Sequence, residues 1–248
     1  MVELPQGEAR GRYAREMFGS IAPRYDLLNH LLSGGLDRRW RQRAAAAACG
    51  DAGSAGGVLV DVCTGTGDLA IALARRAPRA HIIGCDFSRP MLALAQRKFA
   101  AAGLAARTTL VEADAMALPM AAGAAAAVTC AFGLRNLTDT RRGLAEMARV
   151  VRPCGRVVLV EFHSPRGLGA LADVFALYLR RVLPRLGARI SGGDRGGYQY
   201  LADSIMDFGP PERTAASLEA AGLADVRVQP LAGGIASVFV GVVNGTQG

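Results

Sequence analysis

The stretch from Val58 to Ala70, VLVDVCTGTGDLA, constrains the fold of this chain more than any other segment. A short apolar run ends in the glycine turn Gly65-Thr66-Gly67, and residues with helical apolar spacing follow directly. This order is typical of the strand, tight loop and helix that open a βαβ unit. Glycines let the backbone approach a ligand closely and take positive φ angles. The segment therefore predicts a ligand site at the carboxyl edge of a parallel sheet.

An acidic residue, Asp86, ends the next apolar run. A carboxylate at that position can bind the two hydroxyls of a ribose, so we expect an adenosine-containing cofactor. The loop also satisfies the GxGxxA dinucleotide fingerprint through Gly65, Gly67 and Ala70, which leaves the kind of cofactor open at this point.

Strands and helices alternate through the middle of the chain, which predicts an α/β fold with a parallel sheet and helices on both faces. The predicted strands lie near 57–62, 81–85, 107–111, 125–131 and 155–161, with helices near 67–77, 88–102 and 138–151. Two late strands, near 224–229 and 235–242, follow a helix that begins at Pro210-Pro211. They favour a seven-stranded sheet with an antiparallel last strand, as in methyltransferases, over a nicotinamide-dependent oxidoreductase.

The segments outside this alternation suggest how the single domain, 1–248, is organised. The N-terminal region reads as helical pieces broken at Pro23 and at Gly34-Gly35. A Rossmann-like core does not need such a segment, so we expect it to cover the site as a lid. The predicted parts are an N-terminal helical lid (1–50), a cofactor-binding core (51–165), a substrate- or membrane-facing helical insertion (166–209), and a C-terminal helix with the last two strands (210–248).

The insertion carries a broad apolar helical face between Arg166 and Arg189. Its C-terminal half is cationic, with arginines at Arg180, Arg181, Arg185 and Arg189. This pattern suits a helix lying on anionic lipid. An ordinary amphipathic helix packed on the domain explains it more simply, and both interpretations stay open.

Charge and composition narrow the partners. The 29 basic and 21 acidic side chains give a net charge of +8, which favours an anionic partner. We expect an anionic membrane surface and no nucleic acid, because no zinc finger, aromatic RNA-binding motif or basic tail is present. Without a signal peptide or a spanning run of about 20 apolar residues, we expect a cytoplasmic protein able to bind the inner membrane face. No metal site is predicted from the five scattered cysteines, and the oligomeric state, including a homodimer, stays open.

Four separated blocks resemble the ubiquinone/menaquinone-biosynthesis C-methyltransferases, which use S-adenosylmethionine. The blocks are Tyr25-Asp26-Leu27-Leu28-Asn29 to Ser33 followed by Trp40, Asp61 to Asp68, Phe132-Gly133-Leu134-Arg135-Asn136, and Arg149 to Phe162. The resemblance extends from about residue 13 to 241. It implies a Rossmann-like class I methyltransferase fold with S-adenosylmethionine as cofactor.

The resemblance also implies the residues that bind the cofactor. Gly65, Thr66 and Gly67 would face the methionine moiety, and Asp86 would hold the ribose. The other implied cofactor residues are Asp61, Asp114, Ala115 and Ala131. Asp114 and Ala115 would meet the adenine edge, whereas Asp61 is either a brace of the loop or a ligand of the amino group.

The implied acceptor is a prenylated quinol, a naphthoquinol (demethylmenaquinol) first and a benzoquinol (the ubiquinol precursor) second. Carbon methylation needs a positioned, deprotonated hydroquinone, and Arg135 would stabilise its phenolate while Asn136 orients the oxygen. Tyr25 and Asn29 would close over the acceptor beside Phe132. Alternatively, Arg135 forms a salt bridge, for example to Asp139, and the other side chains serve lid packing and helix capping.

Several positions depart from the family pattern, which leaves a soluble phenol or polyketide as an alternative acceptor. They include Ala121–Ala127, Ala131, Cys154, His163, where serine is commoner, and Phe239, where histidine is commoner. His163 could be a general base, but we expect a solvated loop histidine.

Overall fold

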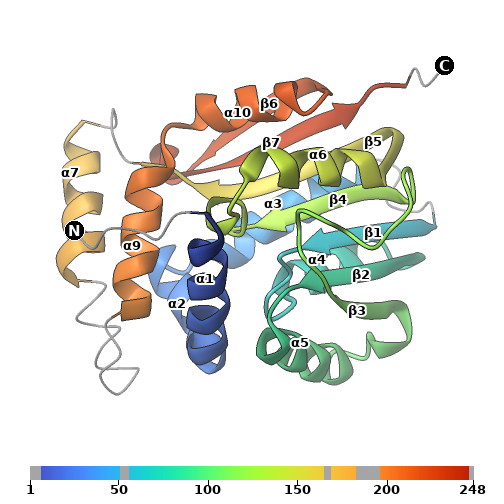
Figure 1. The fold of residues 1–248 in the computed structure, drawn as a ribbon, viewed down its shortest axis with the longest axis horizontal. Coiled ribbons are helices and arrows are strands. Elements are labelled where there is room, and N and C mark those ends of the chain that lie inside the picture. The colour runs from blue at the N-terminus through green and yellow to red at the C-terminus, as the bar shows by residue number, and fades with distance from the viewer. Residues whose placement is uncertain (1–6, 51–55, 165–168, 183–195, 246–248) are drawn as a thin grey trace.

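A seven-stranded sheet forms the centre of the computed structural model, which describes residues 7–50, 56–164, 169–182 and 196–245 (Figure 1). The strands are β1 (Gly57–Val62), β2 (Ala80–Asp86), β3 (Thr108–Glu112), β4 (Ala125–Ala131), β5 (Val151–Phe162), β6 (Leu223–Leu231) and β7 (Ala236–Val243). Their order is β3-β2-β1-β4-β5-β7-β6. All pairings are parallel except those of β7, which runs antiparallel to both β5 and β6. The predicted seven-stranded, mostly parallel sheet is confirmed.

Helices cover both faces of the sheet (Figure 1). They are α1 (Gly7–Ile21), α2 (Tyr25–Leu32), α3 (Asp37–Cys49), α4 (Asp68–Arg76), α5 (Arg89–Ala101), α6 (Thr140–Val150), α7 (Ala170–Leu177), α9 (Gly196–Phe208) and α10 (Pro211–Ala220). The predicted breaks near the N-terminus are confirmed. Pro23 lies in a 3-10 turn between α1 and α2, and Gly34-Gly35 lies in the turn before α3.

Strand β5, in the interior of the sheet, shows that the sheet is buried on both sides. Val158 and Val160 belong to an apolar core shared with α3 and α4, whereas Val157 and Leu159 belong to a second core shared with α6 and α10. All four are at most 1% exposed. A strand covered on both faces reads as a continuous apolar run, and this run ends in the polar residue Glu161.

The residues at the N-termini of α5 and α6 differ in whether their side chains cap the helix. Asp139 caps α6, because its side chain accepts a hydrogen bond from the backbone N–H of Arg142 at 3.0 Å. Ser88 stands at the N-cap position of α5, but its buried hydroxyl has no partner among the described residues. The carboxylate of Asp86 accepts the Ser88 N–H instead, at 2.9 Å.

The insertion is helical where the structure describes it. A π-helical turn, η4 (Tyr178–Val182), continues α7, and Arg185 and Arg189 lie outside the described residues. The Tyr178 hydroxyl donates to the carbonyl of Leu31 on α2 at 2.8 Å, so this segment packs on the N-terminal helices. Within the described part of the chain, no helix is both long and apolar enough to cross a bilayer.

The sheet places the ends of β1 and β4 side by side. β1 connects to β2 on one side and β4 connects to β5 on the other, so the strand order reverses between them. Such a switch point leaves a crevice outside the carboxyl ends of the strands, where ligands bind in open α/β sheets. Helices α1, α2 and α9 gather at this edge (Figure 1).

Replacement of Gly67 by alanine should destabilise the fold by about 2–3 kcal/mol. Gly67 has φ +85°, and an added Cβ would lie 2.6 Å from the ring of Phe99, which is 2% exposed. Urea denaturation measures the change.

The control is Gly103→Ala, at φ +69° with nothing within 4 Å of the added Cβ. It isolates the backbone strain and should cost about 1 kcal/mol. Equal losses in both variants would show that the ring of Phe99 does not restrict the loop.

Candidate functional site

Asp61, near the end of β1, holds the following loop through hydrogen bonds. One carboxylate oxygen accepts the hydroxyl of Thr64 and the other accepts the hydroxyl of Thr129 on β4, both at 2.7 Å. Burial raises the pKa of Asp61 to about 6, against these two hydrogen bonds, which lower it. Both oxygens therefore hold the protein's own loop and strand, which fits the interpretation of Asp61 as a brace.

Asp86 joins the carboxyl ends of β1 and β2. Its Oδ2 accepts the backbone N–H of Gly65 at 2.8 Å, and its Oδ1 accepts that of Ser88 at 2.9 Å. Burial raises the pKa of Asp86 to about 6. The backbone N–H of Phe87 also favours the charged carboxylate, and because a carboxylate has about four acceptor positions, at least one remains for a hydroxyl of a bound ligand.

Backbone strain marks both strand ends at the switch point. Cys63, after β1, has φ +55°, and Phe132, after β4, has φ +60°. Bulky residues rarely adopt such angles, and strain of this kind clusters at functional sites. The carbonyl of Phe132 accepts hydrogen bonds from Arg135 Nη1 at 2.8 Å and from Asn136 Nδ2 at 3.2 Å, which stabilise the strained peptide.

A small cavity of about 40 Å³ lies between these strand ends and the N-terminal helices. Its lining includes five of the predicted residues, namely Tyr25, Gly65, Asp86, Phe132 and Asn136. Sequence reasoning missed the apolar side chains that line it, namely Phe18, Phe87 and Met91. The position of Phe87, directly after Asp86, was a signal that could have revealed one of them.

The other predicted residues lie around this cavity without lining it: Asn29, Asp61, Thr66, Gly67, Asp114, Ala115, Ala131 and Arg135. Asp114 is exposed and accepts the backbone N–H of Met116 at 2.9 Å, which shapes the turn after β3. Asn29 and Thr66 are buried, at 1% and 3% exposure, within or beside α2. The predicted site residues therefore form an inner set, which lines the cavity, and an outer set, which does not.

Arg135 belongs to the outer set and forms a buried ion pair. Its Nη1 contacts Glu161 Oε1 at 2.5 Å, and the two side chains are 1% and 0% exposed. Its Nε donates to the hydroxyl of Ser204 on α9 at 3.3 Å. A salt bridge was one of the two expected roles, but the partner is Glu161 rather than Asp139, which caps α6.

Tyr25 lies where α2 meets the cofactor loop. A Cβ built on Gly65 would lie 3.4 Å from Cε1 of the Tyr25 ring, so ring and loop are in van der Waals reach. Burial raises the pKa of the Tyr25 phenol, while the side chain of Asn29 and the charge of Arg135 act in the opposite direction. The phenol therefore stays protonated at neutral pH and can donate a hydrogen bond.

Comparison with known proteins identifies this arrangement. The model of the ubiE/COQ5 methyltransferase family matches residues 6–243. The chain belongs to this family. It is therefore a methyltransferase that uses S-adenosylmethionine, as the four blocks predicted.

Two relatives are similar over nearly their whole length. A demethylmenaquinone methyltransferase of Deinococcus radiodurans is 50% identical over 94% of this chain and 93% of its own. One of Thermus thermophilus is 49% identical over 91% of this chain and 99% of its own. A solved structure, a putative S-adenosyl-L-methionine-dependent methyltransferase from Methanococcus maripaludis, has a TM-score of 0.61 with 18% identity, over 92% of this chain and 93% of that one. It confirms the predicted fold class.

The residues at the cavity fit S-adenosylmethionine in chemical character. Phe18, Phe87 and Met91 provide apolar walls suited to an adenine ring. Asp86 keeps at least one acceptor position for a ribose hydroxyl. The side-chain oxygen of Asn136, which lines the cavity, has no partner among the described residues.

Two departures from the family pattern meet in space. His163 and Phe239 pack edge to face with ring centroids 5.4 Å apart. The family resemblance implies serine and histidine at these two positions, where this chain has histidine and phenylalanine. The expectation of a solvated His163 is wrong, because the residue is 0% exposed and burial lowers its pKa to about 4.

The alanine-rich segment that departs from the family pattern lies away from the site. Ala121–Ala127 covers the turn before β4 and its first residues, whereas Phe132 follows the other end of that strand. The run therefore stands at the opposite edge of the sheet from the cavity and carries no information about the acceptor.

His163→Ser should make the fold less sensitive to acid. A histidine in the unfolded chain has a pKa near 6.5, so it binds a proton as pH falls from 7 to 5. Buried His163 in the folded chain has a pKa of about 4 and stays neutral over this range. The wild type should lose about 2 kcal/mol of unfolding free energy relative to the variant over this range. Urea denaturation at several pH values measures it.

Asp61 and Asp86 act with the opposite sign, because their raised pKa values make the folded chain bind protons first as pH falls through 6. Both aspartates are present in the wild type and in His163→Ser, so their contributions cancel when the unfolding free energies of the two proteins are compared. His163→Gln, which keeps a polar side chain without a titrating ring, should behave as His163→Ser does. Parallel pH profiles for all three proteins would rule out the buried neutral imidazole.

Proposed function

We propose that the enzyme methylates a ring carbon of a prenylated hydroquinone, with demethylmenaquinol the preferred acceptor and the ubiquinol precursor the second. The observation that carries this proposal is the likeness to the two demethylmenaquinone methyltransferases, which spans more than nine-tenths of every chain compared. The chemistry of the site supports it.

The cofactor supplies a methyl group already activated by its sulfonium, so the protein's task is to position the acceptor and exclude water. Phe132 lines the cavity, and two further buried aromatic rings pack behind it. Phe132 stacks on Phe162 with centroids 4.9 Å apart, and Trp40 lies 5.7 Å from Phe162 and 6.3 Å from Phe132. The face of Phe132 at the cavity suits a flat quinol ring, and the two rings behind it exclude water.

We propose that Asn136 and Tyr25 contact the acceptor and that Arg135 acts from behind them. Asn136 lines the cavity with an unpaired amide oxygen, which can accept a hydrogen bond from the acceptor's hydroxyl. Arg135 is buried in its pair with Glu161, so its effect on a phenolate is that of a dyad rather than of a free cation. In this role it also fixes the peptide that carries Phe132 and Asn136.

Product analysis tests the acceptor. With S-adenosylmethionine and a demethylnaphthoquinol that carries a short prenyl chain, we expect one methyl group on the ring carbon. Asp86→Ala should weaken cofactor binding by about tenfold and lower turnover accordingly. Methylation of an unprenylated soluble phenol, with no product from the prenylated quinol, would contradict the proposal and favour the soluble alternative.

We also propose that α7 and η4 touch an anionic membrane. Val174 and Leu177, one helical turn apart, are 64% and 53% exposed, and Val182 is 41% exposed beside exposed Arg181. Together with the net charge of +8, this face combines exposed apolar side chains with a cation. It would keep a cytoplasmic enzyme near a lipid-soluble acceptor, and the homodimer stays a prediction.

Co-sedimentation with liposomes tests this contact. The wild type should bind vesicles rich in anionic lipid and be released by salt, because exposed charges are screened. The double variant Val174→Ser with Leu177→Ser should bind at least about fivefold more weakly, since it removes apolar area from the contact. Val228→Ser, at a 38% exposed position on β6, is the matched control. Equal binding by both variants would exclude α7 as the contact.

A further inference from the structure

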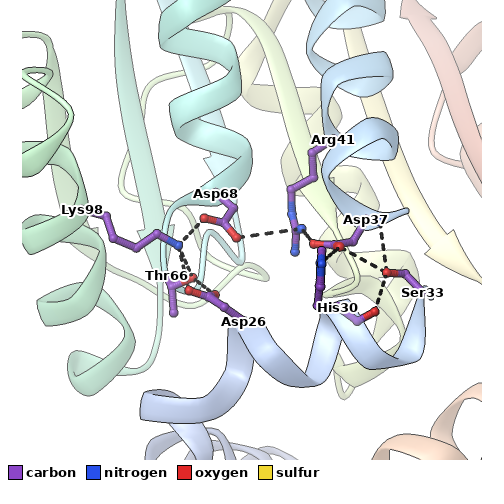
Figure 2. A network of polar contacts seen from close by, with 8 residues as sticks. All are labelled: Asp26, His30, Ser33, Asp37, Arg41, Thr66, Asp68 and Lys98. Carbon is purple, nitrogen blue, oxygen red and sulfur yellow. Dashed lines mark hydrogen bonds and ion pairs between the residues drawn. The ribbon is translucent and has the colours of Figure 1, made fainter. Parts of the chain in front are cut away.

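Polar contacts tie α2 directly to the cofactor loop (Figure 2). The hydroxyl of Thr66, the middle residue of the glycine turn, donates to Asp26 Oδ1 at 2.5 Å. The other oxygen of Asp26 pairs with Lys98 Nζ on α5 at 2.9 Å, and the same ammonium donates to Thr66 at 3.1 Å. Three residues from α2, the loop and α5 therefore meet at one point.

The contacts continue from this point to the other end of α2. They pass in order through Lys98, Asp68, Arg41 and Asp37, and return to α2 at His30 and to the following turn at Ser33 (Figure 2). The His30 ring nitrogen lies 2.7 Å from the carboxylate of Asp37. Helix α2 is thus held against the core near its first residue and near its last.

The three residues of the glycine turn are held in different ways. Gly65 donates its N–H to Asp86, and Gly67 packs on Phe99, so both ends of the turn are held by the core. Thr66 makes its side-chain contacts with Asp26 and Lys98. Of these two partners, only Asp26 belongs to the N-terminal helices.

The same helices close the cavity. Phe18 on α1 and Tyr25 on α2 line it, and its volume of about 40 Å³ is far below the roughly 300 Å³ of small ligand pockets. Binding and release of the cofactor therefore require α1 and α2 to move away from the sheet. Because Asp26 is next to Tyr25 in α2, that movement separates Asp26 from Thr66.

We propose that Asp26 is a positioning residue that couples the closure of α2 to the conformation of the cofactor loop. When α2 closes, Asp26 fixes the Thr66 side chain, and the closed loop retains the cofactor. When α2 opens, the turn loses this partner and the cofactor leaves. This inference rests on the cofactor of the family and not on the identity of the acceptor.

The exposure of the ion pair suits a contact that breaks in every catalytic cycle. The side chains of Asp26 and Lys98 are 47% and 29% exposed. Pairs of this kind contribute little to fold stability and are weakened by salt. The contact can therefore govern the lifetime of the closed state without being needed for folding.

The test measures dissociation of S-adenosylmethionine without any acceptor. Trp40 is the sole tryptophan and is buried against Phe132, which makes its fluorescence a reporter of the site. Asp26→Ala and Thr66→Val should each raise the dissociation rate about tenfold, and the double variant should be no faster than either single one. Thr66→Ser, which keeps the hydroxyl, should restore the wild-type rate.

Further readouts separate positioning from a merely structural role. High salt should speed dissociation from the wild type but not from Asp26→Ala. In Asp26→Ala, the KM for S-adenosylmethionine should rise, whereas kcat, measured at saturating cofactor, should change less. The thermal midpoint without cofactor should stay within about 2 °C of the wild type, as expected for an exposed pair.

The matched control is Glu112→Gln, which removes another ion pair to α5, between Arg89 and a carboxylate on β3, away from α2. It should leave dissociation unchanged. Unchanged rates in Asp26→Ala, an equal effect of Glu112→Gln, or additive effects in the double variant would overturn the proposal. If Asp26→Ala does not fold, Thr66→Val, which removes the other partner of the same contact, decides by the same criteria, with Thr66→Ser as its control.

Discussion

The buried ion pair between Arg135 and Glu161 holds together the part of the sheet edge on which the site depends. It links the segment after β4 to β5, and through Ser204 it includes α9. Removal of one partner from such a pair leaves an uncompensated buried charge, which typically costs about 3–5 kcal/mol. The pair also stabilises the strained peptide of Phe132, because Arg135 donates to its carbonyl. The geometry of Phe132 and Asn136 at the cavity thus follows from an interaction that lies behind it.

A second constraint acts on the other side of the switch point. Gly65 and Asp86 are 21 residues apart, yet one hydrogen bond joins the loop after β1 to the end of β2. The two halves of the edge meet across a narrow cavity, which Phe18 and Tyr25 close from the N-terminal helices. A site built in this way has rigid walls supplied by the sheet and a cover supplied by segments that precede it in sequence. That division fits an enzyme that must release one large cofactor after each methyl transfer.

The positions in the fold of the residues that depart from the family pattern show whether they can affect the site. His163 and Phe239 form one aromatic contact inside the core, so these two departures lie at the same place. Ala121–Ala127 lies at the far edge of the sheet. Neither change touches the cavity lining. The residues that carry the resemblance in the loop after β1 and after β4 are therefore the relevant ones for the chemistry.

The sheet, the glycine loop, the helix breaks and the family could all be predicted from the amino-acid sequence. Apolar periodicity and glycine positions act locally, so they can be read without coordinates. The partner of Arg135, the burial of His163 and the contact between Asp26 and Thr66 follow from the three-dimensional packing and could not be predicted. Glu161 is 26 residues from Arg135 and Thr66 is 40 from Asp26. Such contacts depend on how strands and helices come together, and a single sequence gives no local signal for them.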